Sequence, residues 1–210
     1  MSRYTGSKSR VTRRLGNLPA WVRKNSKKKD TPGQHGKPLK VVTNSRNQTE
    51  YGRRLREKQK LRYNYGISDT QLFNYVKYAK SYKGMTSLML LQLLEMRLDS
   101  ICFALGFGRS LNQVRQLISH GYILVNSKAV NIPSFQCRIK DVIKIKNKAR
   151  FLRIYAKNPE KFPLIEKKRF PSYLKVEKYK YQATVRNYCK RSDIKLKLNE
   201  LLVIEYYSRR

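Results

Sequence analysis

The sequence predicts an α+β fold in which helices precede a small set of strands. Apolar residues recur at helical spacing between positions 69 and 118, and period-two alternation appears only after position 121. Leu, Ile, Val and Phe number 24 among residues 84–146 but only 7 among residues 1–50. The main core is therefore expected within residues 84–146.

The segment before the helices is predicted to be a basic, largely irregular arm. Residues 1–29 contain ten Lys and Arg and no acid, and residues 1–50 contain no Ile or Phe. Such a chain buries too little apolar surface to offset its ordering entropy, so we expect it to be loose until an anion organises it. A basic start without acids also fits an organelle transit peptide, which is an open alternative at this point.

Helix signals begin near Gln48. Good helix formers fill residues 53–62, and Ser68 with Gln71 has the spacing of a capping box before an apolar pattern that stops at Gly84. A leucine-rich helix opens at Thr86 or Ser87, and another runs over 98–105 to Gly106.

A helix followed by strands completes the predicted module. Ser110 and Gln113 form a second capping-box pattern, and the helix 111–120 turns four apolar residues inward. Residues 122–126, 129–130 and 142–146 read as strands, the last with its lysines facing away from the core. Three prolines after Arg150 predict an irregular connector, and residues 201–207 predict a strand or a docked tail.

The charge balance indicates that the chain binds a polyanionic partner. The chain has 48 Lys and Arg against 13 Asp and Glu, a net charge of +35, and self-repulsion of this density favours a phosphate-rich partner. Fifteen tyrosines interleave with basic residues, as in 62–65 and 175–181. Rings that stack on unpaired bases favour RNA, although tyrosines also cover the rims of small cores. No helix-turn-helix, zinc-finger or leucine-zipper motif is recognisable.

The helix 111–120 is the first candidate surface for that partner. Asn112, Arg115 and Ser119 share its polar face, Gln116 lies beside them, and Arg109 precedes its N-terminus, where backbone N–H groups favour an anion. A polar outer face is also how any surface helix stays soluble. We expect that replacing Arg109 and Arg115 together by Ala weakens RNA binding and leaves the fold intact.

Composition argues against several other classes. The longest charge-free stretch in the middle of the chain, residues 84–94, is too short for the ~20 residues of a membrane span. Cys102, Cys137 and Cys189 lack disulfide-framework or zinc-ligand spacing and are expected to be reduced, partly buried thiols. With only two histidines, we assign no metal, no cofactor and no membrane partner.

Enzyme motifs are absent from the sequence. Residues 106–111 begin like a dinucleotide fingerprint, but they follow a helix and lack the third glycine. The sequence contains no phosphate-loop lysine motif and no Gly-x-Ser-x-Gly. We therefore expect no enzyme activity and assign no catalytic residue.

The central residues resemble the RNA-binding module named after protein four of the small ribosomal subunit. The motifs are Glu95–Ser100, Arg115–Gly121, Ile123–Asn126 and Asn131–Ser134. The flanks resemble the ribosomal protein family itself, at Met1–Tyr4, Arg13–Gly16, Pro32–Gly36, Tyr51–Gly52, Leu55–Lys60 and Ile204–Ser208. Residues 91–99 and 199–207 look like plastid members.

The resemblance implies a fold and a function. The fold is a helical N-terminal domain that receives the RNA-binding module, helices on a small antiparallel sheet, as an insertion. We expect an arm over 1–47, a helical domain over 48–96, the module over 97–160, and a connector and returning tail over 161–210. The implied function is a structural constituent of the small ribosomal subunit that binds its rRNA early at a helix junction of the 5′ domain, nucleates assembly of the body, and supports translation accuracy near the site where mRNA enters.

The resemblance also implies contacts and a location. The expected partners are small-subunit rRNA, small-subunit proteins five and three, and nearby mRNA. The expected location is a chloroplast (plastid) ribosome, with synthesis inside the organelle because the match begins at residue 1; a bacterial cytoplasm is the alternative. Lys37 and Lys40 are expected to face the mRNA. The RNA-binding set is Arg97, Arg109, Asn112, Arg115, Gln116, Ser119, His120, Asn126, Lys128, Arg3, Arg13, Arg14, Arg53, Arg56 and Lys60.

Two rival functions would explain some of the same sequence features. Arg97-Leu98-Asp99 echoes a pseudouridine synthase motif whose aspartate is a nucleophile, but Asp99 is expected at a helix start, where an acid complements the dipole without chemistry. The residues after Lys146 are also too few for a catalytic domain. A membrane-surface protein would concentrate its lysines on one amphipathic helix, whereas here they spread over the whole length.

Overall fold

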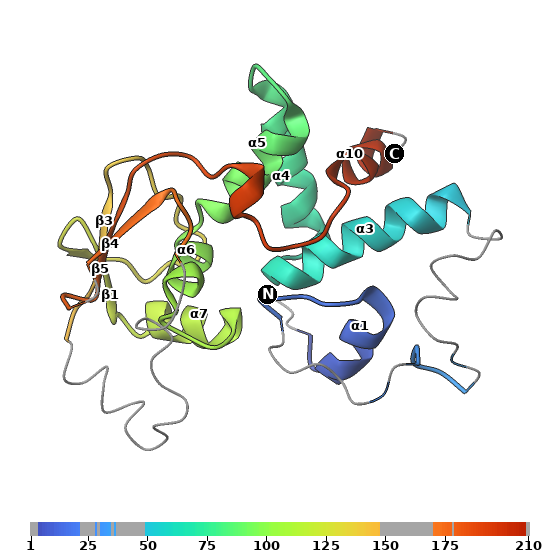
Figure 1. The fold of residues 1–210 in the computed structure, drawn as a ribbon, viewed down its shortest axis with the longest axis horizontal. Coiled ribbons are helices and arrows are strands. Elements are labelled where there is room, and N and C mark those ends of the chain that lie inside the picture. Colours follow the sequence, from blue (N-terminus) through green and yellow to red (C-terminus); the bar gives the residue numbers. More distant parts are fainter. Residues whose placement is uncertain are drawn as a thin grey trace. The chain divides into compact units, whose positions relative to one another are not determined.

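The computed structural model describes residues 4–21, 28, 30–34, 36, 49–147, 170–177 and 179–208 (Figure 1). Contacts divide the chain into two compact units, Met1–Lys80 with Lys195–Arg210, and Ser81–Ile194. Helices form the described part of the first unit, and the second combines helices with an antiparallel sheet. The predicted α+β class is confirmed.

Helix α3 (Glu50–Tyr65) is the longest helix of the first unit. The Thr49 side chain accepts a hydrogen bond from the Gly52 N–H at 3.2 Å, and Gly66 ends the helix in the left-handed region at φ 56°. Helix α4 (Asp69–Ser81) begins with the predicted capping box, because Ser68 and Gln71 each donate a backbone N–H to the other's side chain at 3.2 Å.

The C-terminal residues form a helix and not the predicted strand. Helix α10 (Glu200–Ser208) packs against α3 (Figure 1). Arg54 Nε donates to Glu205 Oε2 at 2.8 Å, and Lys58 Nζ lies 4.6 Å from the centroid of the Tyr206 ring. Tertiary packing overrides strand propensity here, because Val203 and Tyr207 stand four residues apart and are both buried. The alternative of a docked tail is confirmed.

The prediction of a largely irregular arm was wrong for residues 8–15. They form helix α1 (Lys8–Leu15), whose Val11 and Leu15 are buried and which contacts α3. The following chain also packs inward, since the Trp21 ring lies 5.4 Å from that of Tyr63. The few apolar residues of this segment are enough to pack a helix against α3, because their spacing places them on the face that meets α3.

The second unit begins with three helices, α5 (Thr86–Glu95), α6 (Leu98–Leu105) and α7 (Leu111–Ser119). Gly106 ends α6 in the left-handed region at φ 82°, as predicted. Leu90, Leu94 and Ile101 are fully buried, so a core does lie within residues 84–146.

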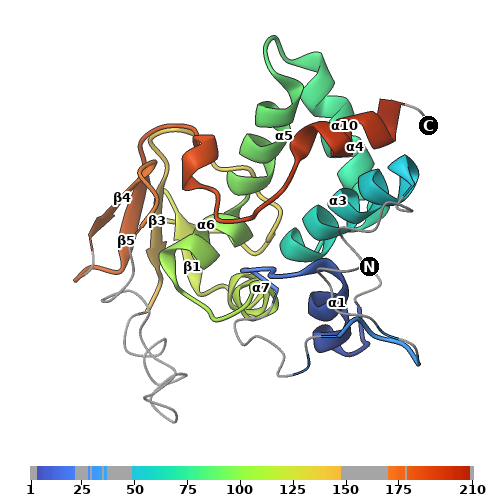
Figure 2. The ribbon, with the colours of Figure 1, turned by 45° about the vertical axis from the view of Figure 1, so that its right-hand side comes forward.

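The sheet of the second unit has five antiparallel strands in the order β2-β1-β3-β5-β4 (Figure 2). The strands are β1 (Ile123–Val125), β2 (Lys128–Ala129), β3 (Val142–Ile145), β4 (Leu174–Glu177) and β5 (Gln182–Val185). In β3 the predicted alternation is confirmed, because Ile143 and Ile145 are buried.

The β4–β5 hairpin lies in the segment that was predicted to be an irregular connector, so that prediction was wrong here. Residues 174–185 extend the sheet through β5, which pairs with β3, and Ala183 and Val185 face the core. This unit therefore runs from α5 through the hairpin, whereas the predicted module spanned residues 97–160. Strands of only four residues, joined by a Lys- and Tyr-rich turn, gave little signal, and the prolines before them suggested irregular chain.

The three cysteines are buried free thiols. Burial raises the pKa of Cys102 well above its ordinary value, and raises the pKa values of Cys137 and Cys189 to about 12. Among the described residues, no cluster of His, Cys, Asp or Glu could hold a metal ion. Within the same residues, none of the helices has the length and apolar character needed to cross a bilayer.

We predict that Val203→Ala lowers the free energy of unfolding by about 2 kcal/mol, because it opens a cavity between α10 and α3. Leu201→Ala, on the same helix but 61% exposed, is the control and should change it by less than about 0.5 kcal/mol. Urea denaturation measures both variants. Equal losses would contradict the docking of α10 through Val203.

Candidate nucleic-acid interface

Helix α7 has the two faces that the sequence predicted. Its residues Leu111, Val114, Leu117 and Ile118 are buried. Asn112, Gln116 and Ser119 are exposed, as is His120 at its C-terminal cap. The Ser110 hydroxyl accepts from the Gln113 N–H at 3.4 Å, while Gln113 Oε1 accepts from the Arg109 N–H at 2.8 Å. The capping box is thus shifted by one residue, and it fixes the loop that carries Arg109.

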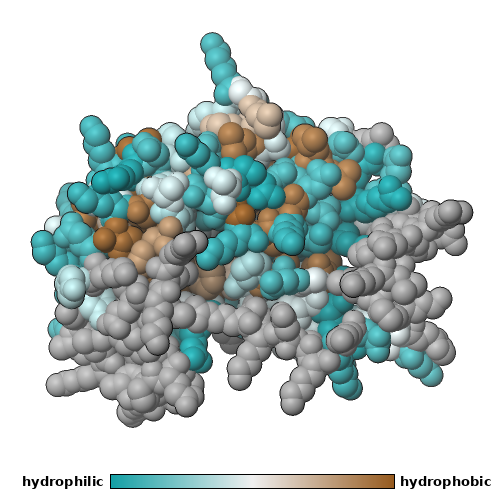
Figure 3. Space-filling view, viewed as in Figure 1, coloured by the Kyte–Doolittle hydropathy of each residue, from teal (hydrophilic) through white to brown (hydrophobic). Residues whose placement is uncertain are grey.

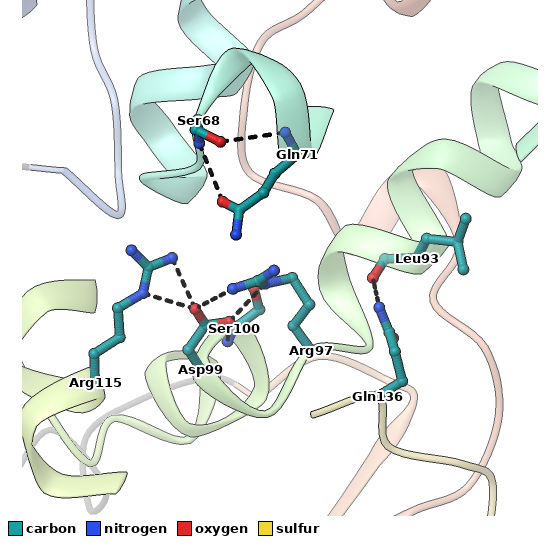
Figure 4. A network of polar contacts seen from close by, with 8 residues as sticks. All are labelled: Ser68, Gln71, Leu93, Arg97, Asp99, Ser100, Arg115 and Gln136. Atoms are coloured by element: carbon teal, nitrogen blue, oxygen red, sulfur yellow. Dashed lines mark hydrogen bonds and ion pairs between the residues drawn. The ribbon is translucent and has the colours of Figure 1, made fainter. Parts of the chain in front are cut away.

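A buried carboxylate joins α6 to α7 (Figure 4). Asp99 lies in the first turn of α6, as expected, and is fully buried. Arg97 donates to it from Nε and Nη2 at 3.0 and 2.8 Å, and Arg115 donates from Nε and Nη2, both at 2.8 Å. Because burial strengthens these contacts and leaves each charge dependent on its partner, the three residues act as one unit, which we call the Asp99 cluster.

The Asp99 cluster corrects two predictions. The Arg97 side chain is 4% exposed, so its guanidinium is not available as the predicted RNA contact. The Arg115 side chain is 23% exposed, which leaves part of it at the surface, but its charge is tied to Asp99. The expectation that replacing Arg109 and Arg115 by Ala leaves the fold intact therefore does not hold for Arg115.

The predicted contact Asn126 has a structural role. Asn126 and Ser127 form the turn between β1 and β2 with φ of 49° and 69°, the left-handed values of a tight hairpin. The Asn126 amide accepts from the Val142 N–H at 2.9 Å and donates to Asp141 Oδ1 at 2.8 Å. These bonds tie the turn to β3. Lys128, at the start of β2, is exposed, as expected for a contact residue.

A groove in the first unit gathers arginines without acids. It has a volume of about 990 Å³ and lies against α1, residues 32–33 and α3. Its lining includes the aromatic side chains of Tyr4 and Tyr63 and no Asp or Glu. We call it the arginine groove after its five cationic lining residues, Arg10, Arg13, Arg14, Arg56 and Arg62.

The local electrostatics of the arginine groove favour an anion. Burial lowers the pKa of Arg56, and the charge of Arg14 lowers it further against the opposing effect of Glu57. Arg13 Nε donates to the Asp30 carbonyl at 2.7 Å, and Arg13 Nη2 to the Thr31 carbonyl at 3.3 Å, which holds this segment against α1. A phosphate in the groove would relieve the repulsion between Arg14 and Arg56 and accept forked hydrogen bonds from them.

The other predicted contact residues differ in exposure and in pairing. Arg53 is exposed on α3, whereas Lys60 Nζ is paired with Glu57. Arg3, Lys37 and Lys40 lie outside the described residues. Sequence reasoning missed Arg10 and Arg62, although Arg10, Arg13 and Arg14 have the i, i+3, i+4 spacing of one helix face. Recognition of α1 as a helix would have found that face.

The surface drawn in Figure 3 is mainly hydrophilic over the described residues, and its apolar residues appear in small groups. Such a surface suits contacts made by charged and polar side chains. The structure thus offers two candidate surfaces for a phosphate backbone: the arginine groove of the first unit, and the outer face of α7 with the β1–β2 turn of the second.

Comparison with known proteins accounts for the whole chain. A family model described as "Ribosomal protein S4/S9 N-terminal domain" matches residues 3–95, and one described as "S4 domain" matches residues 96–143. The chain is 55% identical to small ribosomal subunit protein uS4c of Trieres chinensis and 50% identical to that of Phaeodactylum tricornutum. It is 48% identical to uS4 of Synechococcus sp. (strain RCC307), and each match covers all of both chains.

We predict that Asp99→Ala lowers the free energy of unfolding by about 3–5 kcal/mol, because it leaves the buried Arg97 guanidinium without its counter-charge. Arg115→Ala should cost less, since Arg97 still neutralises Asp99. Gln116→Ala, an exposed change on α7, is the control and should stay within about 0.5 kcal/mol of wild type. Chemical denaturation tests this order, and an Asp99→Ala protein as stable as the control would refute it.

Proposed function

The chain belongs to the uS4 family of small ribosomal subunit proteins, and we propose that it binds small-subunit rRNA through the arginine groove and the outer face of α7. It is a structural ribosomal protein with an RNA-binding S4 domain, and not an enzyme. The observation that carries the proposal is the groove itself, which brings five arginines to one hollow without a carboxylate.

The site chemistry suits RNA backbone recognition. Guanidinium groups donate in pairs to phosphate oxygens, and such contacts fix the orientation of a protein on its nucleic acid. Tyr4 and Tyr63 add aromatic surface to the groove lining, and their rings are 5.6 Å apart. Aromatic faces beside basic groups are typical of surfaces that bind irregular RNA. The groove is therefore proposed to take RNA backbone.

The pseudouridine synthase alternative loses its chemical basis in the structure. A nucleophilic aspartate must reach a substrate atom, whereas Asp99 is fully buried and accepts hydrogen bonds from two arginines. Its contacts hold α6 and α7 together. The arginine-leucine-aspartate sequence is thus explained by packing.

Membership of the family supports a proposal for the place of the protein in the ribosome. We propose that it binds a helix junction in the 5′ domain of the rRNA, nucleates assembly of the subunit body, and contacts proteins five and three. Lys37 and Lys40 are proposed to face mRNA where it enters the subunit, on the resemblance alone. The relatives named uS4c support a plastid ribosome as the location.

We predict that Arg14→Gln with Arg56→Gln weakens binding to a transcript of the small-subunit rRNA and lowers its salt dependence. If each arginine contacts one phosphate, the slope of log K against log salt should fall by about two. Filter binding between low and physiological salt measures the slope. Gln retains helix propensity, so α1 and α3 should stay folded.

The matched control is Lys77→Gln with Lys80→Gln, which removes two exposed charges from α4, outside the groove lining. The control should retain most of the affinity and the slope of wild type. Identical slopes for the two double variants would show that the arginine groove is not the RNA contact.

A further inference from the structure

The β4–β5 hairpin carries a feature that the two family models do not cover. Glu177 pairs with Gln182 across the hairpin, so four residues lie between the last paired positions. Their sequence is Lys-Tyr-Lys-Tyr, residues 178–181, without an acid. The family matches end at residues 95 and 143, so the hairpin lies beyond the matched S4 domain.

Tyr179 presents an aromatic side chain at this tip. Its exposed fraction is 93%, the highest among the exposed large apolar and aromatic side chains of the described residues. The strands beneath it are well anchored, because Ala183 and Val185 are buried and β5 pairs with both β3 and β4. Because the strands that carry the tip are already paired, they lose little backbone conformational entropy when the ring binds.

The surroundings of Tyr179 are cationic. Lys175 is exposed on β4, and the Lys180 side chain is 73% exposed and lies 3.2 Å from Glu177 Oε2. A flat ring beside ammonium groups matches a nucleotide, whose base can stack and whose phosphate can be neutralised, better than it matches an apolar protein surface.

We propose that the β4–β5 tip is a separate RNA contact in which Tyr179 stacks on an unpaired base and Lys180 meets an adjoining phosphate. This inference rests on the proposed function as an rRNA-binding protein. It adds a contact of a different kind, because stacking requires an unpaired base, whereas the arginine groove recognises phosphates. The ligand class is single-stranded rRNA, such as a loop or a bulge.

The test compares Tyr179→Ala, Tyr179→Phe and Tyr179→Leu in the full chain, with small-subunit rRNA transcript as the probe. Alanine and leucine should lose about fivefold or more in affinity and phenylalanine less than twofold, because stacking needs the ring and not the hydroxyl. The salt slope should stay at the wild-type value for all three, since no charge is removed. Lys180→Ala should instead lower the slope by about one.

Two controls separate stacking from other effects. Tyr78→Ala removes a ring that is 64% exposed on α4 and should leave affinity within twofold of wild type. A fully paired RNA duplex should bind Tyr179→Ala and wild type equally. Wild-type affinity for the Tyr179→Ala variant on the rRNA transcript would overturn the inference, as would retained affinity of Tyr179→Leu, which would show that binding does not need an aromatic ring.

The outcomes also distinguish this inference from the proposed function. A wild-type protein that fails to bind the rRNA transcript would refute the proposed function, and this inference with it. A wild-type protein that binds the transcript while every Tyr179 variant binds equally well would refute only the hairpin contact.

Discussion

The structure depends on how 13 acidic residues are distributed among 48 cationic ones. Without counter-charges, a chain of this composition resists compaction, because like charges repel at every step of burial. Acidic side chains of the described residues make contacts that hold elements together. These residues are Glu57, Asp69, Glu95, Asp99, Asp141, Asp193 and Glu205.

The position of each carboxylate has consequences for function. Asp99 joins α6 to α7, Glu205 joins α10 to α3, and Asp141 fixes the β1–β2 turn through Asn126. With these acids engaged in the framework, the charged residues that line the arginine groove are all arginines. The fold is thus stabilised by the same distribution of charge that leaves a surface for phosphate. Cations that pair with acids support the fold, and Arg62 of the groove is one of them because it also pairs with Asp69. The groove arginines are the proposed contacts for RNA.

Much of this arrangement could be predicted because it is local. The Ser68 capping box, the end of α6 at Gly106 and the inward face of α7 each depend on residues within a few positions of one another. The alternation of buried and less buried residues in β3 could equally be predicted from the sequence. Family motifs then identified the RNA-binding module, whose residues 96–143 match the S4 domain.

The parts that could not be predicted depend on distant residues. Whether Arg97 faces solvent or Asp99 is decided by burial, and the sequence shows only that the two are close. Val203 and Tyr207 become helical because α3 provides a surface for them, and α1 forms because Val11 and Leu15 meet the same helix. The arginine groove unites Arg14 with Arg56 across 42 positions of sequence, so only the fold reveals it.

The central claim is that the surplus positive charge is neutralised by small-subunit rRNA, and sedimentation tests it most directly. The native protein, followed by immunoblotting through a sucrose gradient of a plastid extract, should travel with small ribosomal subunits at low salt. Ribonuclease treatment should release it from that fraction. Protein recovered at the top of the gradient from untreated extract, free of ribosomal particles, would contradict the claim.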